Sequence, residues 1–153
     1  MTEEQRKANR RLGLILVSAL PSWRVLRHPS NAQNIKGAMA YVAAHRQAGD
    51  HVVLGSLTHK AFDFYTPTFQ FDDLPVVLFR QTPNPYHDAL ATVRRICLDP
   101  TAGRSWLLIS HRLSDQATLL DVMRSISPSL DRWEGDGAAA FLHDFRSSAY
   151  CQR

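Results

Sequence analysis

The chain has 153 residues, of which 44% are apolar and 21% are charged, and its formal net charge is +4. This length fits one domain, and the composition excludes a disordered or low-complexity protein. The excess charge lies in residues 1–30, which carry six lysines or arginines against two glutamates, whereas residues 31–153 are balanced. A nucleic-acid-binding protein spreads basic residues over a folded face, so we predict no nucleic-acid partner.

Residues 1–30 form a basic arm that contains a short apolar run. The basic cluster at residues 6–11 precedes the apolar residues 12–20, and Pro21 ends the run. Nine residues rise only about 14 Å as a helix, about half of a bilayer core, so this is not a complete membrane span. Three interpretations stay open: a signal-peptide core, the end of a membrane helix, or a buried strand. We predict this arm and one α/β domain over residues 31–153.

An amphipathic helix that runs into an apolar strand is predicted from Asn31 to Leu57. Apolar side chains recur with the spacing of one helix face, at Ile35, Ala38, Met39, Val42 and Ala43. The glycine at Gly49-Asp50 is expected to end this helix as a C-cap. The apolar run at residues 52–56, which begins with two β-branched valines, then predicts a buried strand.

The rest of the chain continues to alternate strands and helices. We expect a turn or short helix at 61–66 ended by Pro67, strands at 75–80 and 105–110, helices at 86–98 and from Ser114 or Asp115 to Pro128, and a C-terminal hairpin of 130–134 and 138–145 around Asp136-Gly137. This order predicts an α/β fold, a Rossmann-like three-layer sandwich with a mainly parallel sheet and a C-terminal antiparallel hairpin.

The residues that follow each predicted strand are the candidates for a ligand site, because open α/β sheets bind ligands beyond the carboxyl ends of their strands. Histidines and cations at these ends, with one residue of the aromatic cluster at 62–71, give the tentative ligand-binding set His59, Lys60, Tyr65, Arg80, His111 and Arg112. The cations and histidines suit an anion such as phosphate. Two alternatives stay open: strand ends are polar because they emerge into water, and aromatic residues are core material.

The usual signatures of a small α/β enzyme are absent from the sequence. The first strand is not followed by a Gly-x-Gly-x-x-Gly turn, and neither a phosphate-binding loop nor a Gly-x-Ser-x-Gly elbow occurs. A metal site from His59 and His111 with Asp63 or Asp115 lacks the close spacing of metal-binding motifs. We therefore predict no catalytic residue, no metal and no cofactor.

The two cysteines, Cys97 and Cys151, are too few and too far apart in sequence for a disulfide scaffold or a zinc site. Cys97 falls on the apolar side of a predicted helix, so we expect a buried thiol there. The cysteines leave the cellular compartment open.

Five segments resemble the soluble C-terminal domain that follows the last membrane helix in many bacterial GT-C-type glycosyltransferases. They are Asn34–His45, Gly49–Val53, Phe64-Tyr65, Arg104–His111 and Gly137–Leu142. These glycosyltransferases, similar to protein mannosyltransferases and aminoarabinose transferases, use sugars linked to polyprenyl phosphate. The likeness covers roughly residues 31–145, and none of the segments is catalytic in that family.

The resemblance implies a non-catalytic module that assists a membrane glycosyltransferase. Its partners would be the membrane domain or a lipid-linked sugar, and its location would be the periplasm or cell exterior, in association with a membrane. That family's catalytic carboxylate lies in a membrane domain, so no catalytic residue is carried over. Two other hypotheses remain: a free-standing small ligand-binding protein or enzyme that binds a phosphate-bearing ligand at the strand ends, and an interaction domain without a small-molecule site.

Overall fold

Helices and strands alternate through the part of the chain that the computed structural model describes, residues 34–80, 83–101, 103–111 and 114–152. In order, the elements are α2 (Ile35–His45), β1 (His51–Leu54), α3 (His59–Phe69), β2 (Val76–Leu78), α4 (Pro85–Leu98), β3 (Arg104–Ser110), α5 (Ser114–Ile126), β4 (Ser129–Gly135) and β5 (Ala138–Asp144). The predicted basic arm lies outside these residues. None of the helices in the described ranges is long and apolar enough to cross a membrane.

The five strands form one mixed sheet in the order β2-β1-β3-β5-β4. β1 pairs in parallel with both β2 and β3, whereas β5 pairs antiparallel with both β3 and β4. The α/β prediction and its C-terminal antiparallel hairpin are confirmed. The sheet is parallel only on the β2-β1-β3 side, because the hairpin inserts β5 beside β3 and places β4 at the far edge.

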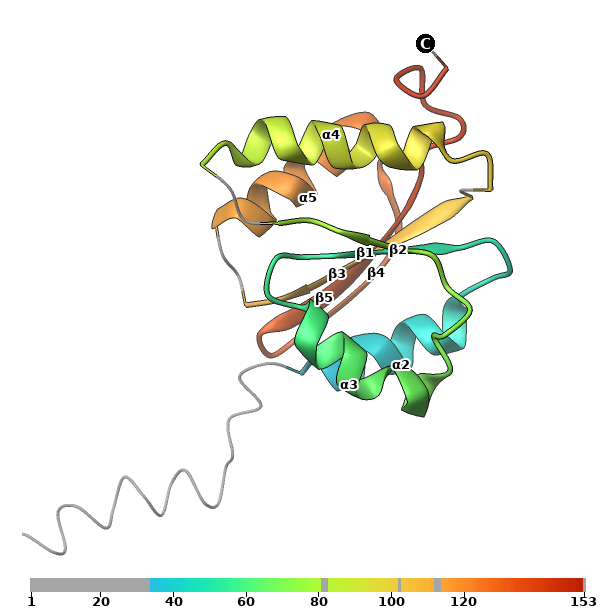
Figure 1. Cartoon of the computed structure of the whole chain (residues 1–153), viewed down its shortest axis with the longest axis vertical. Helices are drawn as coiled ribbons and strands as arrows, with labels where there is room; N and C mark the ends of the chain where they lie inside the picture. The colour runs from blue at the N-terminus through green and yellow to red at the C-terminus, as the bar shows by residue number, and fades with distance from the viewer. Residues whose placement is uncertain (1–33, 81–82, 102, 112–113, 153) are drawn as a thin grey trace, which may run out of the picture. The chain divides into compact units, whose positions relative to one another are not determined.

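Both faces of the sheet are covered by helices (Figure 1). α2 and α3 lie on one face and α4 and α5 on the other, so neighbouring residues of one strand enter different cores. In β1, Val52 and Leu54 join the α2/α3 core, while Val53 joins the α4/α5 core. Burial on both faces explains why β1 and β3 are continuous apolar runs in the sequence.

The first helix is shorter than its sequence predicts. Asn34 caps α2 by accepting a hydrogen bond from the backbone N–H of Gly37 at 3.0 Å. The helix ends at His45, and Arg46 follows in an extended conformation. The predicted glycine C-cap is wrong: Gly49, at φ +83°, instead makes the turn that leads into β1.

Pro67 does not end α3. The helix continues to Phe69 with Pro67 inside it, and Gln70 ends it in a left-handed conformation at φ +56°. Pro67 has no N–H to donate to the carbonyl of Asp63, and both residues are exposed, so water can replace the missing bond. A surface position thus tolerates a proline that the sequence alone marks as a helix breaker.

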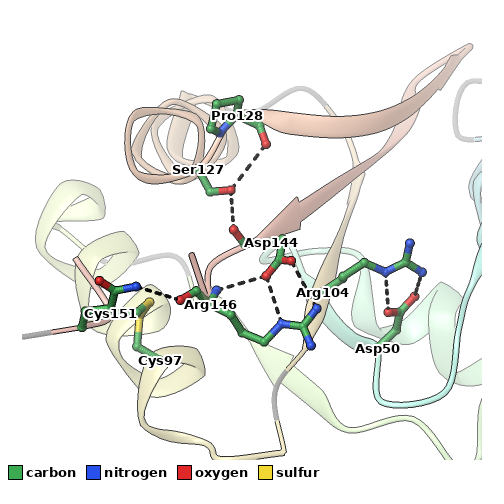
Figure 2. Close-up of polar contacts among 9 residues, drawn as sticks. Asp50, Cys97, Arg104, Ser127, Pro128, Asp144, Arg146 and Cys151 are labelled. Carbon is green, nitrogen blue, oxygen red and sulfur yellow. Dashed lines mark hydrogen bonds and ion pairs between the residues drawn. A yellow bond between two sulfur atoms is a disulfide. The ribbon is translucent and has the colours of Figure 1, made fainter. Parts of the chain in front are cut away.

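The two cysteines form a disulfide, which corrects the expectation of a buried thiol at Cys97 (Figure 2). Cys97 on α4 is bonded to Cys151, which lies beyond β5, with Cα atoms 5.0 Å apart. The disulfide ties the C-terminal segment to α4. The pairing could not be predicted from the sequence, because the two cysteines are separated by 54 positions and strands β3, β4 and β5 lie between them.

Candidate functional site

The carboxyl ends of β1 and β3 lie side by side where the chain divides between the two faces of the sheet. β1 leads into α3 on one face, and β3 leads into α5 on the other. In open α/β sheets, this point is where ligands settle. The polar residues gathered here are therefore the candidate site.

Backbone and side-chain hydrogen bonds connect the turn after β1 to the end of β3. The backbone N–H of Gly55 donates to the carbonyl of Leu108 at 2.9 Å, and the backbone N–H of Thr58 donates to the carbonyl of Gly55 at 3.0 Å. The Thr58 hydroxyl oxygen accepts hydrogen bonds from the N–H of Ser110 at 3.0 Å and from its hydroxyl at 3.2 Å. Thr58 and Ser110 are both buried, so this end of the sheet is fixed.

Gly55 lets α5 approach the end of β1. A Cβ atom at this position would lie 3.1 Å from Cδ and 3.2 Å from Nε2 of Gln116, and 3.2 Å from a methyl of Ile109. Close approach, not a positive φ, is what requires glycine here. The amide of Gln116 consequently lies against the backbone of Gly55, directly after β1.

Asp115 and Gln116, in the first turn of α5, are buried polar residues with unused hydrogen-bonding capacity. Their exposures are 3% and 0%. Asp115 Oδ2 accepts a hydrogen bond from the Ser56 hydroxyl at 2.8 Å. Within the described residues, Asp115 Oδ1 and both amide atoms of Gln116 have no partner. Each such buried group costs about 1–3 kcal/mol, so three together require an explanation.

Three of the predicted site residues lie at this edge. His59 and Lys60 begin α3 directly after the turn, His59 partly exposed and Lys60 exposed. His111 follows β3 at φ +65°, with its N–H donated to the carbonyl of Gly137 at 2.9 Å. Its Nδ1 lies 3.3 Å from the Ser110 hydroxyl. A positive φ is uncommon for a residue with a side chain and is found preferentially at functional positions.

The other predicted residues lie elsewhere. Tyr65 is in the middle of α3, edge to face with Phe64 at 4.9 Å between ring centroids, and packs against the α2/α3 core. Arg80 follows β2 and lines an open groove of about 550 Å³ between β2 and α4. Arg112 lies outside the described residues. Among the residues that the structure describes, no three potential metal ligands come together.

The sequence patterns did not single out Gln116, and they indicated only a capping or metal-binding role for Asp115. A usable pattern was present: Asp115 and Gln116 lie three to four residues before Leu119, on the buried stripe of α5. A polar pair on an apolar stripe indicates either a buried network or a site.

At the opposite edge of the sheet, where β1 and β3 begin and which is called the amino edge below, a buried carboxylate is fully paired; Figure 2 shows its bonds to Arg104. Asp50 accepts two hydrogen bonds from the guanidinium of Arg104, at 2.8 and 3.0 Å, and one from the indole N–H of Trp106 at 3.0 Å. The backbone N–H of Gln47 donates a fourth at 2.9 Å. This network joins the start of β1 to the start of β3.

An open groove of about 540 Å³ lies beside this network, between the end of α2 and the start of β2. Its charged groups mostly pair with each other, as Arg46 does with Asp73 at 2.9 Å. The groove also contains the buried His51, whose Nε2 has no hydrogen bond and lies 3.9 Å from a carboxylate oxygen of Asp99. The groove therefore offers fewer unused polar groups than the carboxyl edge.

Searches against protein-family models, curated proteins and solved structures find no match to this chain.

Proposed function

We propose that this protein is a non-catalytic, extracytoplasmic module of, or related to, a membrane glycosyltransferase that uses lipid-linked sugars, and that it contacts the membrane side of that enzyme. The observation that carries the proposal is an exposed apolar and cationic surface at the start of α3. It comprises Leu57, Lys60 and Phe64 and is called the α3 face below.

The α3 face has the chemistry of a surface that rests on a lipid interface. Lys60 and Phe64 lie four residues apart and so project from the same side of the helix. Phe64 is 75% exposed, and Leu57 in the preceding turn is also exposed. An apolar side chain beside a cation suits the boundary between acyl chains and phosphate groups. Burying one such side chain is worth about 1.5–3 kcal/mol.

The segments that carry the family resemblance support a structural role for this module. Asp50 belongs to the Gly49–Val53 segment, and Arg104 and Trp106 belong to the Arg104–His111 segment. Their hydrogen bonds join the two segments at a buried position. Residues that hold two strands together stabilise a module and are not available for catalysis.

The disulfide supports an extracytoplasmic location. Disulfides persist in the periplasm and outside the cell and are rare in the cytosol. The Cys97–Cys151 bond thus favours the compartment that the resemblance implies. The same proposal includes the finer fold assignment, a Rossmann-like three-layer sandwich, which the helices on both faces of the sheet support.

The test is flotation of the full chain with lipid vesicles. Phosphatidylcholine vesicles carry either undecaprenyl phosphate or an equal charge of phosphatidylglycerol. We expect the protein to float preferentially with undecaprenyl phosphate, and the variant Lys60→Gln/Phe64→Ser to bind about tenfold more weakly, since one lost apolar contact costs that much.

The matched control is Arg94→Gln/Leu98→Ser on α4. This pair also combines a cation with an apolar side chain, and Leu98 is 72% exposed, but it lies on the other face of the sheet. All three proteins keep the same N-terminal arm, so its contribution cancels. Equal loss in both variants, or no preference for undecaprenyl phosphate in the parent, would contradict the proposal.

One observation supports a second candidate function, that of a free-standing protein or enzyme that binds a phosphate-bearing ligand. His59, Lys60 and His111 all lie at the carboxyl edge of β1 and β3. If it is correct, inorganic phosphate raises the melting temperature, and His59→Ala and His111→Ala each reduce that rise. If neither phosphate nor vesicles bind, the third hypothesis, an interaction domain without a small-molecule site, gains support.

A further inference from the structure

We infer that the carboxyl edge between β1, β3 and α5 is a binding site for a neutral polyhydroxylated molecule, a sugar or a cyclitol. The inference rests on the unpartnered polar atoms of Asp115 and Gln116 and not on the membrane surface proposed above. It can therefore be tested independently of the glycosyltransferase proposal.

The unpartnered atoms define what a ligand must supply. Asp115 Oδ1 and Gln116 Oε1 need donors, while Gln116 Nε2 needs acceptors. A hydroxyl group is both donor and acceptor, so hydroxyls can satisfy a carboxylate oxygen and both ends of an amide. An apolar molecule would leave these atoms unsatisfied.

The charge of the site favours a neutral ligand. The carboxylate of Asp115 already occupies the amino end of α5, where the helix dipole favours one negative charge. A phosphate placed against this buried carboxylate would meet like-charge repulsion. The buried groups therefore favour hydroxyls, whereas the partly exposed His59 and the exposed Lys60 are the groups that would meet an anion in water.

Ser56 is the partly exposed polar residue that contacts the buried carboxylate. Its hydroxyl is partly exposed and donates to Asp115 Oδ2 at 2.8 Å, so it is the outermost polar contact of the carboxylate. A ligand hydroxyl can take the place of the Ser56 hydroxyl on Asp115. The amide of Gln116 packs directly against Gly55, which carries no side chain, and marks the inner limit of the proposed site.

The experiment titrates the full chain, without vesicles, with methyl α-mannoside, methyl β-glucoside and myo-inositol, and follows binding by amide chemical shifts. We expect at least one of the three to bind and to shift the signals of the 55–58 turn and the first turn of α5. Inorganic phosphate, added as a competitor, is expected to leave this binding unchanged.

The deciding variant is Gln116→Met, which keeps the volume and removes both unpartnered atoms. Its affinity should fall at least tenfold, while its melting temperature without ligand stays equal or rises, because an unsatisfied amide has been replaced by an apolar group. Gln47→Met, at an exposed glutamine of the opposite edge, is the matched control and should bind as the parent does.

Asp115→Asn provides a second test in case Gln116→Met does not fold, and it too should weaken binding. Absence of binding by all three probes, or parent-like affinity in the variants at positions 115 and 116, would overturn the inference and leave a structural site that holds water. Competition by phosphate would overturn the neutral class of ligand. None of these outcomes depends on vesicle flotation, so they leave the proposed function untouched.

Discussion

Two buried aspartates lie at opposite edges of the same pair of strands, and their surroundings differ. Asp50 is 2% exposed and accepts four hydrogen bonds, two of them from Arg104. Asp115 is 3% exposed and accepts one, from the hydroxyl of Ser56. The two carboxylates are therefore almost equally buried, but among the described residues Asp50 accepts four hydrogen bonds and Asp115 accepts one.

This difference separates a structural carboxylate from one available for binding. A fully satisfied buried ion pair fixes the register between β1 and β3, and breaking it leaves charged donors without partners. A carboxylate with an open oxygen, beside an amide with no partners, keeps binding capacity at a cost in stability. The site proposed at one edge thus contrasts with a structural network at the other.

The largest expected effect follows from Asp50→Asn. The amide group places N–H donors against Arg104 and Trp106, and the guanidinium, only 17% exposed, loses its counter-ion. We expect the free energy of unfolding to fall by about 3–5 kcal/mol, measured by urea denaturation. Asp73→Asn is the control: its exposed ion pair with Arg46 is worth at most about 1 kcal/mol. Similar losses in both variants would remove the distinction between a buried and an exposed pair.

The disulfide should contribute the next largest effect. Replacing Cys97 and Cys151 together by alanine releases a loop of 54 residues, which we expect to lower the free energy of unfolding by about 2–4 kcal/mol. Reduction of the parent protein with dithiothreitol should produce the same loss. If the double variant has the same free energy of unfolding as the untreated parent, the disulfide does not stabilise the fold.

Acid should destabilise the amino edge in two steps. Burial lowers the pKa of His143 below its ordinary 6.5, although its hydrogen bond to the carbonyl of Ser127 opposes this. The unfolded chain therefore binds a proton before the native one does, and stability falls as the pH drops below about 6.5. Hydrogen bonds from Arg146 lower the pKa of Asp144, so a second loss follows in more acidic solution.

The first acid step is measured by urea unfolding between about pH 8 and about pH 5. His143→Gln should flatten the pH dependence in this range, because the group that titrates differently in the two states is gone. The matched control is His87→Gln, at an exposed histidine. A parental slope in His143→Gln would assign the step to another group.

The smallest effect is expected from Asp115→Asn, the same substitution as at Asp50. The Ser56 hydroxyl can rotate to donate to or accept from the new amide, and no charged donor is left behind. We expect a change in the free energy of unfolding of less than about 1 kcal/mol. A loss as large as that of Asp50→Asn would show that Asp115 is structural and would end the comparison between the two edges.

Local patterns predicted most elements of the fold but misplaced several ends. The i, i+3, i+4 spacing of apolar residues located α2, α4 and α5, and the Asp136-Gly137 turn located the hairpin. The predicted end of α2 and the predicted break at Pro67 were wrong. Pro67 is tolerated because Asp63, whose carbonyl loses its donor, is exposed to water, and no local pattern marked the extended Arg46 that ends α2. Of the candidate site, His59, Lys60 and His111 lie at the carboxyl edge, but Gln116 was missed because its burial is set by packing against Gly55.

The sequence by itself determined the kind of elements, their order and the presence of two apolar faces on β1 and β3, since these follow from the periodicity of neighbouring residues. Only the tertiary structure decided which distant groups meet: Asp50 with Arg104 and Trp106, Cys97 with Cys151, and Ser56 with Asp115. Each of these contacts spans more than fifty residues and depends on the strand order β2-β1-β3-β5-β4. That order is fixed by the packing of both sheet faces at once, and no local stretch of sequence encodes it.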